Sequence, residues 1–295
     1  MFAVVLAAMA GVFYGASDFS GAAASRGNHP TVVTLGVQIT SVVALIGALF
    51  VLDGVFHPAD LVWGALGGLS LAAGLALFYE ALTVGPIATA ASLTALVSAS
   101  LPILAGLALG DRPAPLTLLG VALAVPAAVL VSAGEVGVQM KRTNTTPRER
   151  VVGQRQLNRT RMLSVGAGTL FAGFLVALSQ VGEDAGLFPL LGTRAAAISF
   201  LVLLITLQRV WTPVRRQSVP LVMAGGLFDC GADGFLLTAY VTGDLSWVAA
   251  ISSLAPVSTV LLARVFFKER LTIVQIIGLA LSAAALALVA VGRNM

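Results

Sequence analysis

One long polar stretch, Glu135 to Arg161, divides a chain that is otherwise almost wholly apolar. The blocks on either side are similar in length, and each is dominated by hydrophobic runs. The two acidic residues of the stretch are outnumbered by its basic ones: Lys141, Arg142, Arg148, Arg150, Arg155, Arg159 and Arg161. Thr143 to Pro147 interrupt any helical periodicity. We therefore expect two hydrophobic halves, residues 1–134 and 162–295, joined by a basic, mobile linker over residues 135–161.

The composition indicates a membrane protein. Of the 295 residues, 58% are hydrophobic and 10% are charged, whereas a soluble domain has about 25% charged residues. So little polar surface cannot cover a globule in water, and the lipid bilayer must be the main partner of the chain. Beside so much apolar sequence, the basic linker is better explained as setting membrane topology than as binding nucleic acid. The single Cys230 excludes an intramolecular disulfide, and His29 and His57 have no neighbouring ligand residues, so we expect neither metal nor cofactor.

Ten segments are long and apolar enough to cross a bilayer as helices, which takes about 20 residues each. In the first half they are Phe2–Ala24, Thr31–Leu52, Leu61–Thr83, Pro86–Leu109 and Pro115–Ala133. In the second half they are Met162–Val181, Leu187–Gln208, Val219–Val241, Leu245–Phe267 and Thr272–Val291. The first segment has no Lys or Arg before it and is longer than the apolar core of a signal peptide, so we expect a retained helix. The predicted fold is an all-α integral membrane protein with ten transmembrane helices.

The two halves repeat each other. When the sequence is shifted by 158 residues, Leu77–Gly134 falls on Phe235–Gly292 without a gap. Asp111-Arg112 then meets Glu269-Arg270, and the glycine that follows eight residues after each arginine is matched as well. Apolar matches arise easily in such a composition, but a polar pattern in register does not. Because each half has an odd number of helices, the second half must enter from the opposite side, so the five-helix repeats are inverted, as in many secondary transporters.

These loops resemble those of EamA-type proteins in the drug/metabolite transporter superfamily. The matching stretches are Ala81–Gly120, with Gly85-Pro86 and Gly110-Asp111-Arg112, and Ala239–Gly278, with Leu254-Ala255-Pro256 and Lys268-Glu269-Arg270. The resemblance covers nearly the whole chain and rests on structural motifs. It implies export or exchange of small metabolites by alternating access through a central cavity, and it does not name a substrate. The chain departs from the family pattern where Ser98 stands in the place of Pro256 and where Tyr14-Gly15 replaces a frequent Trp-Gly.

The basic residues of the loops predict how the chain crosses the membrane. With ten spans, the face that carries both termini holds Arg112 and Arg293, and the opposite face holds thirteen basic residues, including the seven of the linker. The positive-inside rule therefore places the linker in the cytoplasm and both termini outside the cell membrane. Members of the resembled family more often have their termini inside. The bias nevertheless persists without the linker, at two basic residues against six.

Ionisable residues inside the spans mark the candidate site, because a charge in lipid must face a cavity or a partner. They are Asp18, Glu80, Arg194, Asp229, Asp233 and Arg264. Asp229 and Asp233 are four residues apart on one predicted helix, so they point the same way. Two carboxylates so placed in a low dielectric cannot both ionise cheaply, which favours proton or cation binding. The structural alternative is that one of them pairs with Arg194 and only holds the helices together.

Arg194 is a natural anchor for a carboxylate or phosphate on a substrate. Gln38 takes the equivalent place in the first half, because Leu35-Gly36 aligns with Leu191-Gly192. Asp18 faces either a cavity or the membrane interface, and Glu80 and Arg264, near span ends, are interpreted as structural. The other candidates for substrate binding or coupling are Tyr14, Ser98, Ser252, Ser253 and Pro256. The serines could instead bond back to their own helices.

The sequence therefore predicts a secondary transporter, not an enzyme, that moves an amino acid or related metabolite across the cytoplasmic membrane. Export and proton coupling are the expected mode. No Gly-x-x-x-x-Gly-Lys-Ser/Thr loop supports direct ATP drive. One alternative is efflux of drug-like cations. A second is an intramembrane lipid-modifying enzyme, for which the spans lack histidine and a Ser-Lys pair. A third is a channel, against which the inverted repeat argues.

Overall fold

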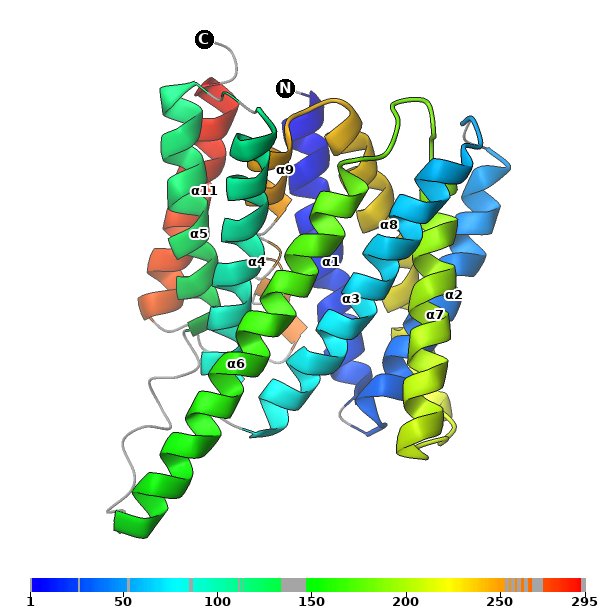
Figure 1. Ribbon diagram of the computed structural model, residues 1–295, viewed down its shortest axis with the longest axis vertical. Coiled ribbons are helices and arrows are strands. Elements are labelled where there is room, and N and C mark those ends of the chain that lie inside the picture. The colour runs from blue at the N-terminus through cyan, green and yellow to red at the C-terminus, as the bar shows by residue number, and fades with distance from the viewer. Residues whose placement is uncertain are drawn as a thin grey trace.

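The structure, a computed structural model, describes residues 2–25, 27–51, 54–84, 87–110, 112, 114–133, 147–252, 255, 258, 261–262, 265–266 and 273–292. Within these ranges the regular elements are helices, and no strand occurs in them. The helices stand side by side in one bundle (Figure 1). The N-terminal end of the first helix and the C-terminal end of the last lie at the same end of this bundle, which we call the termini end; the other end is the linker end.

The helix bounds agree with the expected segments to within a few residues for most of the chain. The first half contains α1 (Phe2–Ser25), α2 (Pro30–Leu49), α3 (Pro58–Val84), α4 (Ile87–Leu109) and α5 (Pro115–Ala133). The second half contains α6 (Pro147–Leu178), α7 (Phe188–Gln208), the short 3₁₀ helix η2 (Arg216–Ser218), α8 (Val219–Val241), α9 (Leu245–Ser252) and α11 (Ile273–Gly292). Prolines stand in the first turns of α2, α7 and α8, where the missing N–H costs nothing. The expected span Leu245–Phe267 lies partly outside the described residues.

The helix that contains the sixth expected span begins well before Met162, because α6 starts at Pro147. The second part of the basic linker is therefore helical, and it extends beyond the rest of the bundle at the linker end (Figure 1). Its Arg, Glu, Gln and Leu residues are good helix formers, and Pro147 is tolerated at the first position. Hydropathy detects the apolar span but does not detect this polar extension of the same helix.

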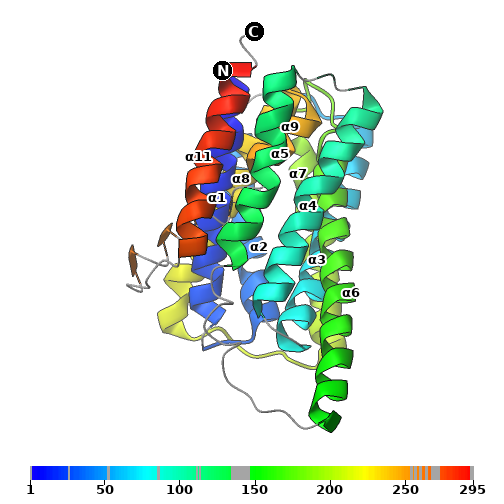
Figure 2. The ribbon, with the colours of Figure 1, turned by 90° about the vertical axis from the view of Figure 1, so that its left-hand side faces the viewer.

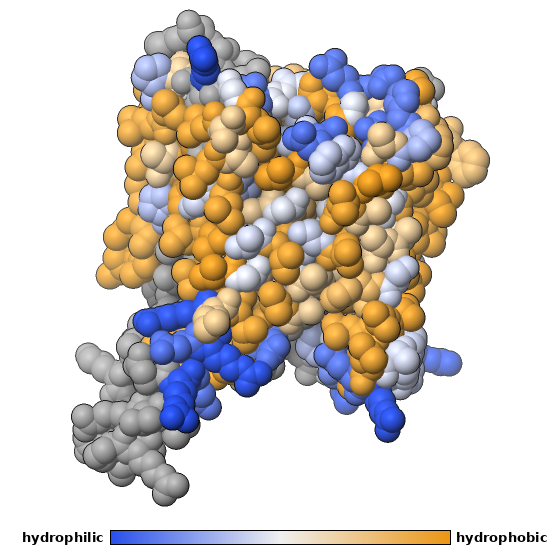
Figure 3. Space-filling view, viewed as in Figure 1, coloured by the Kyte–Doolittle hydropathy of each residue, from blue (hydrophilic) through white to orange (hydrophobic). Residues whose placement is uncertain are grey.

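The surface of the bundle is that of a multi-pass membrane protein. Six helical stretches of the described chain are long and apolar enough to cross a membrane: Phe2–Ser25, Pro30–Leu49, Pro58–Phe78, Arg155–Leu178, Phe188–Gln208 and Arg216–Val241. Large hydrophobic side chains such as Val43, Leu203 and Leu207 are exposed on the outside. Figure 3 shows an apolar belt around the middle of the visible face, with hydrophilic residues gathered toward both ends. An apolar belt of this kind is suited to lipid.

Helices from the two halves pack against each other in matched pairs. Helix α1 packs on α8 and α3 packs on α6, while α2 contacts α8 and α3 contacts α7. Helix α5 lies alongside α11 at one side of the bundle (Figure 2). The first helices of the halves run in opposite directions, because α1 leaves the termini end while α6 runs toward it (Figure 1).

The contact between α3 and α7 brings two backbones together. A Cβ atom on Gly64 would overlap the carbonyl oxygen of Pro189, and one on Gly192 would overlap that of Leu61. The hydroxyl of Thr193 donates a hydrogen bond to the carbonyl of Gly64 at 3.0 Å. Such close approach needs glycine and is a common way for helices to associate in lipid. It fixes the position of α7 against the first half.

Loops of the two halves also join at the termini end. The N–H of Val55 donates to the carbonyl of Asp184 at 2.8 Å, and the N–H of Gly182 donates to Asp60 at 3.1 Å. His57 Nε2 lies 3.1 Å from Asp184 Oδ2, in an exposed ion pair. We call this set of contacts, between residues 54–60 and 182–188, the loop clasp. It ties the entry of α3 to the entry of α7.

Candidate functional site

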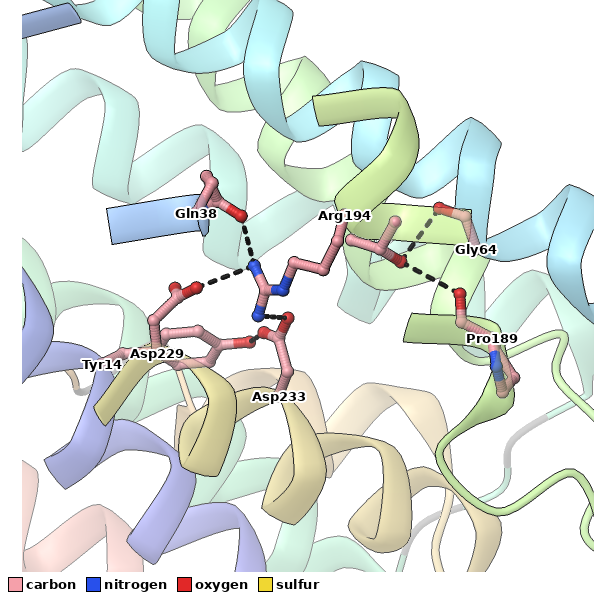
Figure 4. Close-up of polar contacts among 8 residues, drawn as sticks. Tyr14, Gln38, Gly64, Pro189, Arg194, Asp229 and Asp233 are labelled. Carbon is pink, nitrogen blue, oxygen red and sulfur yellow. Dashed lines mark hydrogen bonds and ion pairs between the residues drawn. The ribbon is translucent and has the colours of Figure 1, made fainter. Parts of the chain in front are cut away.

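A single arginine lies fully buried in the middle of the bundle. Arg194, on α7, is 0% exposed, and its guanidinium group is held by three side chains (Figure 4). Nη1 lies 2.7 Å from Asp229 Oδ2 and donates to Gln38 Oε1 at 2.5 Å. Nη2 donates to Asp233 Oδ2 at 2.6 Å. We call Arg194 and the residues that hold it, together with Tyr14, the arginine network.

Tyr14 connects the network to the first helix. Its hydroxyl donates a short hydrogen bond to the second oxygen of Asp233 (Figure 4). Asp233 is thus held by both α1 and α7, and its side chain is 1% exposed. Asp229 is more accessible, with 12% of its side chain exposed, and its contact with Arg194 is an ion pair that lacks hydrogen-bond alignment. The Nε–H of Arg194 is buried without an acceptor among the described residues.

Local packing explains why these side chains meet. Thr193 is bonded to α3, so Arg194, one residue later and turned by about 100° around the helix, points to the other side of α7. A Cβ on Gly226 would overlap Thr40, so α2 and α8 are in close contact and Gln38 is brought near the aspartates. On α1, Phe13 packs edge-on against Phe228 and Phe235 of α8, which sets the rotation of α1 and turns Tyr14 toward Asp233.

The structure brings together five of the residues singled out from the sequence: Tyr14, Gln38, Arg194, Asp229 and Asp233. Asp229 and Asp233 share one face of α8, as their spacing predicted, and both pair with Arg194 rather than one of them. The guanidinium that the sequence offers as an anchor for a substrate is therefore occupied by the protein's own carboxylates. The carboxylate of a substrate could bind this guanidinium only after Asp229 or Asp233 had dissociated from it.

Asp18 lies outside the network but on the same side of α1. Along this side, Ala7 and Gly11 are buried, Tyr14 is half-buried and Asp18, one turn further toward the linker end, is exposed. Helix α9 covers this side of α1 toward the termini end, where the backbone at Ser252 approaches Gly11. The neighbouring residues Ser17, Ser20 and Ala24 remain buried toward the linker end, so the exposure on this part of α1 is local to Asp18.

The remaining candidates lie elsewhere. Ser98 is half-buried on α4, which packs against α5, α6 and α9 rather than forming part of the arginine network. The hydroxyl of Ser252 is buried and donates to the carbonyl of Ala249 at 3.1 Å, so it bonds back to its own helix. Ser253 and Pro256 lie outside the described residues. Glu80 pairs with Arg159 of α6 in an exposed contact, which is the structural role expected for it.

Sequence reasoning did not find the contact between Tyr14 and Asp233. Tyr14 was a candidate only as a residue that could line a cavity, since a tyrosine in a span is more often found at the membrane interface. A signal was nevertheless present, because Phe13, Phe228 and Phe235 are the aromatic residues that lock α1 onto α8.

Comparison with known proteins agrees with this architecture. Residues 160–291 match the model of the EamA-like transporter family, which belongs to the drug/metabolite transporter superfamily. No curated protein matches the chain. A crystal structure of another protein covers 99% of this chain and 99% of its own, with a TM-score of 0.75 at 18% identity, and so has the same fold. Residues 160–291 of this multi-pass membrane protein therefore match the EamA-like transporter family of the drug/metabolite transporter superfamily, as the resemblance of its loops predicted.

Proposed function

We propose that the protein is a secondary transporter that exports a small metabolite, an amino acid or related solute, across the cytoplasmic membrane by alternating access. Ten helices form two inverted halves, and the solute passes between them. Three features support this architecture: the match to a transporter family, the opposite directions of α1 and α6, and the paired contacts of α1 with α8 and of α3 with α6. Opposed halves are what alternating access requires.

The arginine network is the coupling centre of this proposal, and its charge is the observation that carries it. One guanidinium pairs with two carboxylates, so the fully ionised group has a net charge of −1 in a buried place. A buried charge without compensation is unfavourable, and a proton or a cationic group offsets it. The network is thus suited to binding a proton in one step of the cycle and releasing it in another.

Protonation also changes what Arg194 can bind. A protonated Asp233 no longer attracts the guanidinium as an anion, and Nη2 becomes free to accept the carboxylate of a substrate. Proton binding and substrate binding are then linked through one side chain. The step also loosens contacts between the halves, because Tyr14 and Gln38 belong to the first half and Arg194 and Asp233 to the second.

Two features indicate which state of the transport cycle the structure represents. Asp18 is exposed on the linker-end half of α1, beside the buried Ser17 and Ser20, and this exposure supports a conformation whose centre is reached from the linker end. The loop clasp and the close contact of α3 with α7 support closure of the termini end. With the linker in the cytoplasm and the termini outside, this is an inward-facing carrier.

Efflux of cationic compounds is the second candidate. Among the described residues of the spans near the centre, three carboxylates, those of Asp18, Asp229 and Asp233, stand against the single cation of Arg194. This excess of acid favours a positively charged solute over an anionic one. No comparable observation favours an intramembrane enzyme.

A thermal-shift screen on the detergent-purified protein tests the proposal, since a ligand of the folded state raises its apparent stability. Amino acids and drug-like aromatic cations are tested at pH 5.5 and pH 8, on the wild type and on Asp233→Asn. The metabolite proposal expects an amino-acid hit whose shift depends on pH in the wild type and no longer depends on pH in the variant. A hit among aromatic cations alone would replace it with cation efflux, and each hit is then tested by counterflow in liposomes, which a channel does not show.

A further inference from the structure

The carboxylate of Asp18 is the exposed acid nearest in sequence to the arginine network. It lies one helical turn from Tyr14 on α1, so their Cβ atoms are about 5–6 Å apart. Asp18 is exposed, Tyr14 is half-buried and Asp233 is 0% exposed. The three therefore form a series from solvent to the middle of the bundle, and the inner link is the hydrogen bond from the Tyr14 hydroxyl to Asp233.

The surroundings of Asp18 leave it free to bind and release a proton. No hydrogen-bond or ion-pair partner is present for it among the residues that the structure describes. The titratable groups of α8, which packs against α1, are Asp229, Cys230 and Asp233, and of these the charge of Asp229 acts on Asp18. Tyr14 lies one turn away on α1, and the described parts of α2 and α9 bring no titratable group. Repulsion from Asp229 acts on Asp18, while Arg194 is held by the other two aspartates.

We propose that Asp18 is the linker-side entrance of a proton path that reaches the arginine network through the Tyr14 hydroxyl. This inference rests on the proposed proton coupling and adds the route. A proton from water at the linker end binds the Asp18 carboxylate. It passes through a bridging water to the phenolic oxygen of Tyr14, while Tyr14 gives its own hydroxyl proton to Asp233. Asp18 is again a carboxylate, Tyr14 is unchanged and Asp233 has become a carboxylic acid.

The geometry gives this path one direction of access. Toward the termini end, α9 packs against α1, with the backbone of Ile251 and Ser252 next to Gly11, and the α9 side chains Trp247 and Ile251 are 1% and 2% exposed. These apolar residues carry no proton-transfer group on their side chains apart from the indole N–H, which donates to Asp244. Protons in this conformation therefore reach the network from the linker end, the side that the charge bias places in the cytoplasm.

The test uses the proton itself as the probe, so no substrate has to be known. Proteoliposomes with the full chain are adsorbed on a solid-supported electrode, and a pH jump produces a transient current as protons bind inside the protein. The wild type is expected to give such a current. In Asp18→Asn a current should remain, and the total charge moved should fall only by the share of the one lost proton-binding group. The decay of the current should slow at least about tenfold, because the relay loses its first acid–base group.

Three further variants separate the route from a general loss of structure. Asp18→Glu keeps a carboxylate and should restore the rate. Glu80→Gln removes an exposed carboxylate that pairs with Arg159 outside the network, and should leave the current unchanged. Tyr14→Phe, which keeps the ring, should slow the decay as Asp18→Asn does.

The outcomes of the proposed path and of proton coupling can be told apart. A wild-type current whose decay is the same in Asp18→Asn or in Tyr14→Phe would overturn the path and leave proton coupling standing. Absence of any current in the wild type would overturn both proton coupling and the path. It would leave the proposal that the protein transports a metabolite intact.

Discussion

The side-chain oxygen of Gln38 accepts a hydrogen bond from Arg194, with 2.5 Å between Oε1 and Nη1. Each of these residues stands two positions after a Leu-Gly pair, on the second helix of its half. The positions of α3 that match Asp229 and Asp233, under the shift of 158 that aligns the repeats, are Leu71 and Leu75. Equivalent places in the two halves thus meet at the centre, but the charges come from the second half alone.

Loss of the buried guanidinium should destabilise the protein strongly. Arg194→Gln leaves Asp229 and Asp233 buried without a cation, and breaking a buried pair in this way costs about 3–5 kcal/mol. The apparent melting temperature in detergent should fall accordingly. The triple variant with Asp229→Asn and Asp233→Asn removes the charges together and should recover most of the stability. Equal melting of the single and triple variants would show that the pairs do not hold the centre.

The contact of α3 with α7 should tolerate no side chain at Gly64. In Gly64→Ala the added methyl overlaps the carbonyl of Pro189, and overpacking of this kind costs about 1–3 kcal/mol. Gly47→Ala is the matched control, since nothing lies within 4 Å of its Cβ, and alanine in a helix is favoured over glycine by about 0.5–1 kcal/mol. The two melting temperatures should move in opposite directions. A fall of the same size in both would contradict the close approach.

The loop clasp should weaken at alkaline pH. The hydrogen bond between the two side chains raises the pKa of His57 above its usual value and lowers the pKa of Asp184 below its own. The pair is therefore fully charged between the lowered pKa of Asp184 and about pH 6.5, and the contribution of His57 is lost as pH rises through its raised pKa. Both side chains are exposed, so the effect on stability is small.

Hydrogen exchange checks this, because the N–H of Val55 is bonded to the carbonyl of Asp184. After correction for intrinsic exchange, its protection should be greater at pH 5.5 than at pH 9 in the wild type. In His57→Ala, and equally in Asp184→Asn, this pH dependence should disappear. Persistence of the dependence in either variant would mean that another group controls the clasp.

The charge bias of the loops predicts the orientation of the chain. A green fluorescent protein matures in the cytoplasm but not after export through the Sec pathway. One fused to the C-terminus should therefore stay dark, while one inserted into the linker should fluoresce. The reason is that the linker-side face carries thirteen basic residues and the termini face two. A bright C-terminal fusion would reverse the assignment of the cytoplasmic side and, with it, the side from which Asp18 is reached.

Much of the fold follows from hydropathy, because a run of apolar residues as long as a bilayer is thick has few structures open to it in lipid. The bounds of α5 and α8 are those expected from the sequence. The polar start of α6 was missed for the same reason: Pro147 to Arg161 are helical through propensity and continuity with the span, and hydropathy does not report either.

The site was predictable where it depends on spacing along one helix or on the repeat. Asp229 and Asp233 share a face because they are four residues apart, and Gln38 was found by alignment of the halves. The contact of Tyr14 with Asp233 depends instead on how α1 is rotated against α8. That rotation comes from the packing of Phe13 between two aromatic residues of another helix, which no spacing within α1 specifies.

Proton coupling by the arginine network is tested most directly by measuring solute counterflow and internal pH together, in liposomes that contain a pH dye. With a solute found in the thermal-shift screen, the wild type should move protons with the solute. Asp233→Asn, which keeps the shape of the side chain but cannot exchange a proton, should retain counterflow and lose the pH change. Wild-type transport without any pH change, or proton movement that survives in Asp233→Asn, would contradict the claim that the arginine network couples protons to transport.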